Sequence, residues 1–255
     1  MSSPFDLTGR VAVVTGVGGP RGIGFATAAT LGTLGASVVV SGGSGRVRDR
    51  AGELSAVAVV GDLTLPGTAD ELVATAVSRH GRLDVAVNCA GMTSASSTAP
   101  ESGRAQEMPF ATWRAGVARN LDSAFLFAKA VLPALARAGA GRLVMVASLT
   151  GSAMGMRGEV AYGAAKAGMV GLVRCLALDE AAAGVTVNAV APGWIATDSQ
   201  TPHEHAQGLR TPLRRSGTAA EVASLIAYLC TPSAAYVTGQ CLVVDGGNSI
   251  AEERA

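Results

Sequence analysis

The stretch VAVVTGVGGPRGIG, Val11 to Gly24, decides the fold. A short β-branched run stops at a glycine loop, and a helical segment, Gly22 to Leu34, follows it. Glycines let a pyrophosphate approach the backbone, and a helix N-terminus offers free N–H groups and a partial positive charge. An ordinary glycine-rich turn is the alternative, but this order of elements favours a dinucleotide-binding loop. Its candidate contact residues are Gly16, Arg21, Gly22, Ile23 and Gly24.

Strands and helices alternate along the rest of the chain. Further strands are expected at Ser37 to Ser41, Val57 to Val60, Asp84 to Asn88, Arg142 to Ala147, Val185 to Ala191 and Gln240 to Val244. Further helices are expected at Thr68 to Arg79, Phe110 to Ala138 (two stretches meeting near Asn120), Val160 to Ala183 and Ala219 to Leu229. Continuous apolar strands indicate a parallel sheet that is buried on both faces. The pattern predicts one α/β domain over residues 1–255, a doubly wound Rossmann fold of three layers. Long loops are expected at Thr93 to Pro109 and Thr197 to Arg215, the second with room for a short helix.

Composition and charge argue against several kinds of partner. The chain has 255 residues, 49% of them hydrophobic, and a net charge of +1. Its richest basic stretch, Arg46 to Arg50, is short and is interpreted as a solvated loop, so neither nucleic acid nor a membrane surface is expected as a partner. No uninterrupted apolar stretch looks long enough to span a bilayer, and the N-terminus lacks an apolar signal core. A cytoplasmic location is expected.

The cysteines and histidines show no metal-binding pattern. Cys89, Cys175, Cys230 and Cys241 are scattered through apolar segments without a Cys-x-x-Cys pair. The three histidines also lack the spacing of metal ligands. We therefore expect no metal ion and buried free thiols in a reducing compartment.

The end of the second strand bears on which dinucleotide is bound. An acid there often bonds the ribose 2′-OH of NAD. Here the strand ends in Ser41-Gly42-Gly43 without a carboxylate, while Arg21 lies in the glycine loop and Arg46 just past the strand. Because arginine pairs well with phosphate, the pattern favours NADPH over NADH. Both arginines could instead be solvent-exposed charges, and NAD stays possible.

Tyr162 and Lys166 stand four residues apart in YGAAK, and Ser148 precedes Tyr162 by fourteen residues. Residues i and i+4 share a helix face, so the phenol and the ammonium are expected side by side. An ammonium favours the phenolate and lowers the pKa of tyrosine from its ordinary value of about 10. Alone, the motif is weak, because Y-x-x-x-K arises by chance on many amphipathic helices.

Taken together, the motifs resemble the short-chain dehydrogenase/reductase family in its single-domain form, over nearly the whole chain. The matching motifs are the loop Thr15 to Gly24, Asp62-Leu63, Asn88-Cys89-Ala90-Gly91, Asn120, Ser148, Tyr162-x-x-x-Lys166, Pro192-Gly193 with Thr197, and VTGQCLVVDGG near the C-terminus. Each one is weak, whereas their joint order and spacing are highly specific.

The resemblance implies a catalytic set of four residues. Tyr162 would be the general acid in carbonyl reduction and the base in oxidation, and Ser148 would orient the substrate oxygen. Lys166 would bind the nicotinamide ribose and lower the pKa of Tyr162. Asn120 would hold a water that links Lys166 to solvent.

The resemblance also implies cofactor contacts at both ends of the dinucleotide. Asp62 and Leu63 would contact the adenine, although Asp62 could merely cap the turn after a strand. Ser41 and Arg46, at and just past the end of the second strand, are the expected contacts near the adenosine ribose. The other implied contacts are Asn88, Ala90 and Gly91 along the adenosine, and Pro192, Gly193, Ile195 and Thr197 around the nicotinamide.

The glycine loop departs from the usual pattern of the family. Five residues stand between Gly16 and Gly22, which is more than usual. Longer loops occur in the family's enoyl reductases, but those space Tyr and Lys further apart than this chain does. The spacing here therefore argues against enoyl reduction.

The nearest resemblance is to 3-oxoacyl-carrier-protein reductases, which place basic residues where the acidic carrier docks. Lys129 keeps one such position and Leu178 falls at the other, so a free small molecule is favoured. The expected function is NADPH-dependent reduction of a ketone of a small or medium-sized molecule to a secondary alcohol, by a homotetramer or homodimer. The alternatives are an NAD-dependent alcohol dehydrogenase working oxidatively and a 3-oxoacyl-carrier-protein reductase. A non-catalytic dinucleotide-binding regulator is disfavoured, because all four catalytic residues are kept.

Overall fold

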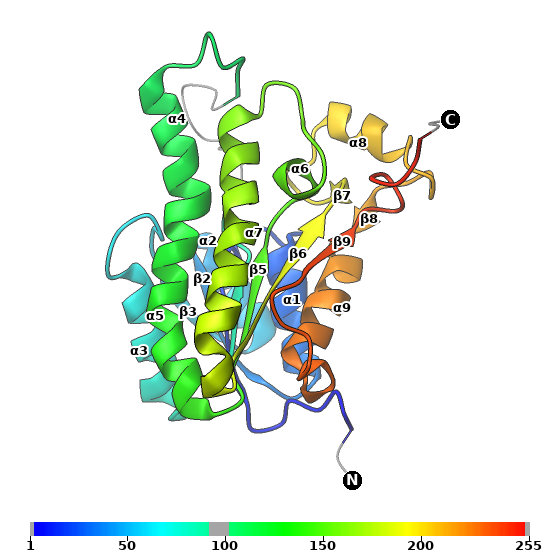
Figure 1. The fold of residues 1–255 in the computed structure, drawn as a ribbon. Helices are drawn as coiled ribbons and strands as arrows, with labels where there is room; N and C mark the ends of the chain where they lie inside the picture. The colour runs from blue at the N-terminus through cyan, green and yellow to red at the C-terminus, as the bar shows by residue number, and fades with distance from the viewer. Residues whose placement is uncertain (1–2, 92–101, 253–255) are drawn as a thin grey trace.

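Seven strands of the protein form one parallel sheet (Figure 1) in the computed structural model, which describes residues 3–91 and 102–252. Their order is β3-β2-β1-β4-β5-β6-β9, so the direction of winding reverses between β1 and β4. The strands are β1 (Val11–Val14), β2 (Ser37–Gly42), β3 (Val57–Val60), β4 (Val85–Asn88), β5 (Arg142–Val146), β6 (Thr186–Pro192) and β9 (Cys241–Val244). A small second sheet pairs β7 (Ile195–Ala196) with β8 (Gly217–Thr218).

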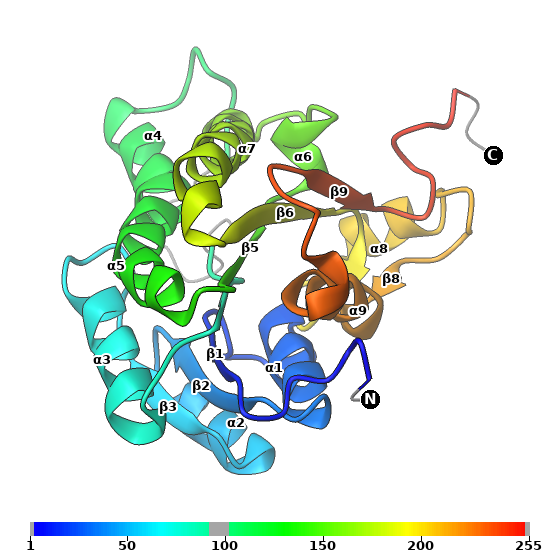
Figure 2. The same ribbon diagram turned by 60° about the horizontal axis from the view of Figure 1, so that its bottom comes forward.

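Helices cover both faces of the large sheet (Figure 2). One layer holds α3 (Thr68–His80), α5 (Ser123–Ala138) and α7 (Val160–Glu180), and the other holds α1 (Ile23–Thr33), α2 (Arg46–Leu54) and α9 (Ala219–Cys230). The remaining helices are α4 (Phe110–Val117), α6 (Leu149–Ser152), α8 (Pro202–Gly208), the π-helical turn η1 (Ala118–Asp122) and the 3-10 turns η2 (Ala181–Ala183) and η3 (Pro232–Ala234).

Alternate side chains of each strand pack into opposite layers. In β1, Val11 and Val13 belong to the apolar core under α3, α5 and α7, whereas Ala12 and Val14 belong to the core under α1, α2 and α9. This is the period-two geometry of a strand that is buried on both faces. The predicted doubly wound α/β fold is confirmed.

The region from Arg46 to Arg50 corrects the sequence interpretation, because it begins helix α2 and is not a loop. Val47 and Ala51, one helical turn apart, are both buried. The charged residues around this narrow apolar face hid the helical period. The predicted pair of helices over Phe110 to Ala138 is confirmed, with η1 as their junction.

The loop predicted at Thr93 to Pro109 lies partly outside the described residues. Among the cysteines, Cys230 is buried, but Cys175 is exposed, so the expectation of buried thiols is wrong for Cys175.

The segment Val160–Ala183 is long and apolar enough to cross a bilayer, by length and composition alone. The segment is not an uninterrupted apolar stretch, because Lys166 and Arg174 stand within it, so the expectation about uninterrupted stretches is not contradicted. The finding is weak support for a membrane span, since core helices of soluble proteins pass the same test. In this fold Lys166, Met169 and Val173 of the helix are buried in the domain.

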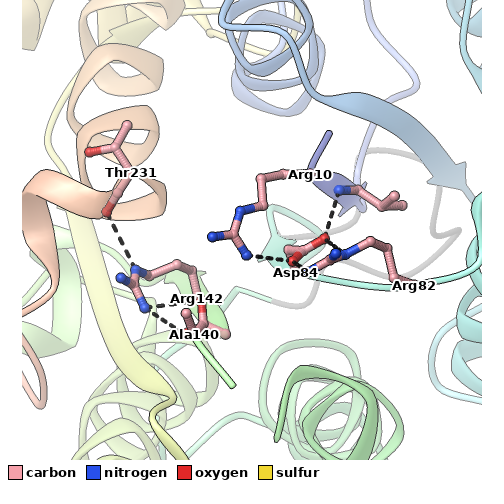
Figure 3. A network of polar contacts seen from close by, with 8 residues as sticks. Arg10, Arg82, Asp84, Ala140, Arg142 and Thr231 are labelled. Atoms are coloured by element: carbon pink, nitrogen blue, oxygen red, sulfur yellow. Dashed lines mark hydrogen bonds and ion pairs between the residues drawn. The ribbon is translucent and has the colours of Figure 1, made fainter. Parts of the chain in front are cut away.

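A buried carboxylate organises the amino-terminal edge of the sheet (Figure 3). Asp84, just before β4, is 1% exposed and accepts hydrogen bonds from Arg10 at 2.8 Å, from Arg82 at 2.6 and 2.8 Å and from the Val11 N–H at 3.0 Å. Burial by itself raises the pKa of Asp84, but these donors outweigh it and lower the pKa below its usual value. The network joins β1 to β4 at the edge where both strands begin.

Asp84→Asn is expected to lower the free energy of unfolding by about 2 to 4 kcal/mol, because two guanidinium groups lose their shared partner. The contribution of Asp84 is present above the ordinary carboxyl pKa and is lost as the pH falls toward the lowered pKa of the folded state. Urea unfolding of wild type and variant from pH 7 to pH 3 measures both effects. Asp70→Asn on the exposed face of α3 is the control, and equal stability of the Asp84 variant and wild type would contradict this account.

Candidate active site

Ser148, Tyr162 and Lys166 come together where β5 ends. Lys166 Nζ lies 5.6 Å from the centroid of the Tyr162 ring and donates to the Val146 carbonyl at 2.9 Å. Val146 is the last residue of β5, and Ser148 follows as the N-cap of α6, where it also hydrogen-bonds Tyr162. The lysine is 1% exposed, so its ammonium ties α7 to the carboxyl end of the sheet.

Asn120 lies in the π-helical turn η1, and π-turns inside helices are often found at functional sites. Its Nδ2 donates to the Gly116 carbonyl at 3.0 Å, while its buried Oδ1 has no hydrogen-bond partner among the described residues. A Cβ on Gly91 would lie 3.0 Å from this Oδ1 and 3.5 Å from Lys166 Nζ. The amide oxygen and the ammonium therefore flank the same point of the chain.

Burial dominates the protonation of the tyrosine and the lysine. It raises the pKa of Tyr162 above its ordinary value; the Ser148 hydrogen bond opposes this, and the charges of Glu159 and Glu204 add to it. Burial also lowers the pKa of Lys166 to about 8. The expectation that Lys166 lowers the pKa of Tyr162 is wrong for the protein alone, because loss of hydration disfavours both charged forms.

The glycine loop fits tightly between β1, β4 and α1. Gly16 has a φ of +73°, and a Cβ there would lie 2.7 Å from the Cys89 backbone. A Cβ on Gly24 would lie 2.6 Å from the Gly16 carbonyl oxygen. Gly22 is the N-cap of α1 and has no side chain to cap the helix, so the first N–H groups at Ile23 and beyond are open to an anion.

Hydrogen bonds hold the ends of β1 and β4 together beside this loop. Thr15 Oγ1 donates to Asn88 Oδ1 at 2.7 Å, and the Ala90 N–H donates to Thr15 Oγ1 at 3.1 Å. Asn88 is fully buried, and Gly91, with φ +117°, follows at the end of this segment.

The residues predicted for the adenosine end differ in their surroundings. Ser41 Oγ is buried without a hydrogen-bond partner in the described part of the chain, and Arg46 is exposed at the start of α2. Asp62 accepts hydrogen bonds from the N–H and hydroxyl of Thr64 at 2.9 and 2.8 Å, which closes a turn. The Leu63 side chain packs in the core and leaves its backbone for contact.

The residues predicted for the nicotinamide end lie where β6 ends. Pro192 is the last residue of β6, and the Gly193 N–H donates to the Val244 carbonyl at 2.9 Å. Ile195 is buried in β7, and the Thr197 N–H donates to its carbonyl at 2.9 Å.

Arg21 makes a contact that the sequence reasoning missed. Its Nε pairs with Asp198 Oδ1 at 2.6 Å, and its backbone N–H donates to Asp198 Oδ2 at 2.9 Å. The feature of the sequence that could have indicated this contact is the acid directly after Thr197, in the loop that contacts the glycine loop. Arg21 thus has a carboxylate partner within the chain.

The donor set fits a dinucleotide. Uncapped N–H groups at the start of α1 and the buried, unpartnered Asn120 Oδ1 offer polar contacts. Doubly wound folds bind a dinucleotide in the crevice outside the carboxyl ends of their strands, and we call this place the groove. A Cβ on Gly18 would meet nothing within 4 Å, so the loop backbone is open on that side. Within residues 3–91 and 102–252, no group of three or more His, Cys, Asp and Glu side chains is arranged to hold a metal ion.

Comparison with known proteins identifies the family. A family profile described as enoyl-(acyl carrier protein) reductase matches residues 16–249. The chain is 39% identical over 251 residues to a 3-oxoacyl-[acyl-carrier-protein] reductase of Synechocystis sp., covering 94% of this chain and 97% of that protein. A Sinorhizobium meliloti structure described as a short-chain alcohol dehydrogenase is similar, with a TM-score of 0.87 and 32% identity over 96% of this chain and 98% of that one. The chain belongs to the short-chain dehydrogenase/reductase family.

A second structural relative widens the range of chemistry. The structure of 7α-hydroxysteroid dehydrogenase with NADH and 7-oxo glycochenodeoxycholic acid has a TM-score of 0.87 and 31% identity, over 97% of this chain and 98% of that one. The predicted family is thereby confirmed, and the protein is an NAD(P)-dependent short-chain dehydrogenase/reductase. Its relatives act on different compounds, so membership does not by itself select the substrate.

Lys166→Met tests how strongly burial disfavours the ammonium. Because folding lowers the pKa from 10.5 to about 8, the folded state gives up this proton first as the pH rises between these values. The wild-type free energy of unfolding therefore gains a contribution over that range, about 3 kcal/mol in all, that the variant lacks. Urea unfolding from pH 7 to pH 10 measures the difference, with Lys129→Met on the exposed face of α5 as the control. Parallel pH profiles of wild type and Lys166→Met would contradict the prediction.

Proposed function

We propose that this enzyme reduces a ketone of a small or medium-sized molecule to a secondary alcohol with NADPH. The observation that carries the proposal is the cluster of Ser148, Tyr162 and Lys166 at the end of β5, on the same sheet edge as the glycine loop. Both parts are required for hydride transfer with proton transfer, and each would be of little use alone.

The proposed mechanism divides the chemistry between cofactor and protein. The reduced nicotinamide would supply the hydride to the carbonyl carbon. The Tyr162 hydroxyl donates its proton to the carbonyl oxygen as that oxygen gains negative charge. Because burial raises its pKa, Tyr162 stays protonated at neutral pH and holds the proton that reduction consumes. Ser148 donates a hydrogen bond to the same oxygen and fixes its direction.

Lys166 and Asn120 are proposed to return the proton to Tyr162. A pKa of about 8 lets the lysine release and regain a proton near neutral pH. Asn120 Oδ1 is an open acceptor close to the ammonium, where it can hold a water in contact with Lys166. The remaining predicted contacts around the groove would bind and orient the dinucleotide.

The preference for NADPH rests on charge at the adenosine end. No carboxylate stands at the end of β2, where NAD-specific folds often carry one, and Ser41 is there instead. Arg46 lies just past this point in sequence, and Arg21 lies in the glycine loop that follows the neighbouring strand β1. NADH is the alternative, since Arg21 is already paired with Asp198 and the steroid dehydrogenase relative is described with NADH.

An apolar cavity supports an apolar substrate. It measures about 220 Å³ and lies between the start of α4 and the start of α7, two residues from Tyr162 in sequence; its lining residues are Ala105, Met108, Phe110, Trp113 and Val160. A 3-oxoacyl group on a carrier protein is the second candidate, which the names of the curated relatives favour. Leu178, at 81% exposure on α7, is uncharged where a carrier would need a basic residue.

Assembly into a homodimer or homotetramer is proposed on surface composition. Leu178 on α7 and Phe125 on α5 are large apolar side chains with 81% and 49% exposure. Contact with a second copy would remove them from water. A cytoplasmic location remains a prediction.

Tyr162→Phe is expected to lower kcat/KM for ketone reduction by about a thousandfold or more, because the proton donor is lost. Dissociation constants for NADPH and NADH, followed by nicotinamide fluorescence, are expected to change little. Activity is measured over a panel of ketones, secondary alcohols and 3-oxoacyl thioesters with both cofactors. A variant that keeps the wild-type rate would rule out this mechanism, and no turnover of any panel member by the folded wild type would rule out the proposed reaction.

Glu204→Gln is expected to shift the pH profile of the reaction. Because the Glu204 charge raises the pKa of Tyr162, removing it lowers that pKa. The alkaline loss of reduction, which needs the protonated phenol, then moves to lower pH, and so does the alkaline rise of oxidation. Gln keeps the helix-capping contact with Thr201, so α8 is retained. An upward shift in either profile would disagree with the assigned charge effect.

A further inference from the structure

The contact between Arg21 and Asp198 joins two loops that are far apart in sequence. Besides the ion pair at 2.6 Å, the Arg21 N–H donates to the other carboxylate oxygen at 2.9 Å. A Cβ on Gly19 would lie 2.8 Å from that oxygen. The Asp198 carboxylate therefore lies directly on the backbone of the glycine loop, at a place where residue 19 has no side chain.

The contact between Arg21 and Asp198 lies at the carboxyl edge of the large sheet. The glycine loop follows β1, and the loop that holds Asp198 follows β6 and β7. In the sheet, β4 and β5 lie between β1 and β6. The contact thus passes over the carboxyl ends of β4 and β5, at the edge where doubly wound folds bind a dinucleotide. Asn88 is the last residue of β4, and Ser148 follows the end of β5.

We propose that Arg21 and Asp198 form a strap across the dinucleotide groove, which opens for the cofactor to enter and opens again for it to leave. This rests on the proposed function, because it takes the groove to be the NAD(P)-binding site. It adds a role for Asp198, a residue outside the predicted cofactor contacts, and a second role for Arg21.

The strap is strong enough to slow exchange and weak enough to open. The two side chains are 76% and 35% exposed, and an exposed ion pair is a weak contact that opens readily. The hydrogen bond to the Arg21 backbone adds to this, and hydrogen bonds from Arg21 also lower the pKa of Asp198, so the pair stays charged at neutral pH. A contact of this strength slows entry and exit by about three- to tenfold.

A strap has a kinetic signature that other roles of the same residues lack. If it closes equally well over the empty and the filled groove, it slows association and dissociation by the same factor and leaves Kd unchanged. A direct ligand of the cofactor changes mainly dissociation. A carboxylate that only repels phosphate changes association, and the sign of the effect follows the charge that is removed.

The experiment compares Asp198→Ala, Arg21→Met and the double variant with wild type. Binding and release of NADH are followed by stopped-flow energy transfer from tryptophan to the nicotinamide. NADH is the decisive probe, since it lacks the 2′-phosphate that Arg21 is proposed to bind. Asp70→Asn, an exposed charge change on α3, is the control and is expected to leave both rates unchanged.

Each single variant is expected to speed both association and dissociation about three- to tenfold, with Kd within about twofold of wild type. The double variant is expected to be no faster than either single one, because the strap is already open. Opposite effects of the two single variants on association, a change in dissociation alone, or unchanged rates would each overturn the strap. Failure of the folded wild type to bind either NADH or NADPH would overturn the proposed function, and the strap with it.

Discussion

The bond from Lys166 to the Val146 carbonyl is the contact on which the candidate site depends. Val146 is the last residue of β5, and the lysine of α7 donates to its carbonyl at 2.9 Å. The bond fixes α7 against β5, and Tyr162, one turn earlier, is placed beside Ser148 as a consequence. Burying the ammonium is unfavourable, which is why its pKa falls to about 8. The same burial makes the lysine suitable for exchanging protons near neutral pH.

Polar side chains are buried at both edges of the sheet. At the amino-terminal edge, Asp84 accepts four hydrogen bonds from three residues, and Arg142 donates to the carbonyls of its neighbours. At the carboxyl edge, buried atoms such as Asn120 Oδ1 and Ser41 Oγ have no hydrogen-bond partner among the described residues. Unpaired buried polar groups destabilise a fold, so they are expected where a ligand completes them. Thr186 Oγ1, at the first residue of β6, is also buried without a partner among the described residues, so such atoms are not confined to the carboxyl edge.

The sequence allowed the prediction of the sheet, its parallel sense and the residues at its carboxyl edge. These follow from continuous apolar runs and from short motifs at their ends, which are local signals. Helix α2 was missed because only Val47 and Ala51 carry its apolar period within a charged segment. The direction of the Tyr162 pKa was missed because spacing gives the neighbour but not the burial of both groups.

The Asp198 contact could not be predicted from the sequence, for a different reason. Asp198 is 177 residues from Arg21 in the chain, and no local pattern joins them. The sheet order brings the carboxyl ends of β1 and β6 to the same crevice, where the lengthened glycine loop contacts Asp198. Gly18 and Gly19 lie before Arg21, and the missing side chain at Gly19 lets the carboxylate reach the loop backbone. The extra loop residues and the acid after Thr197 therefore act together in the proposed strap. A weaker contact between Arg21 and Asp198 would speed cofactor exchange, and a stronger one would slow turnover.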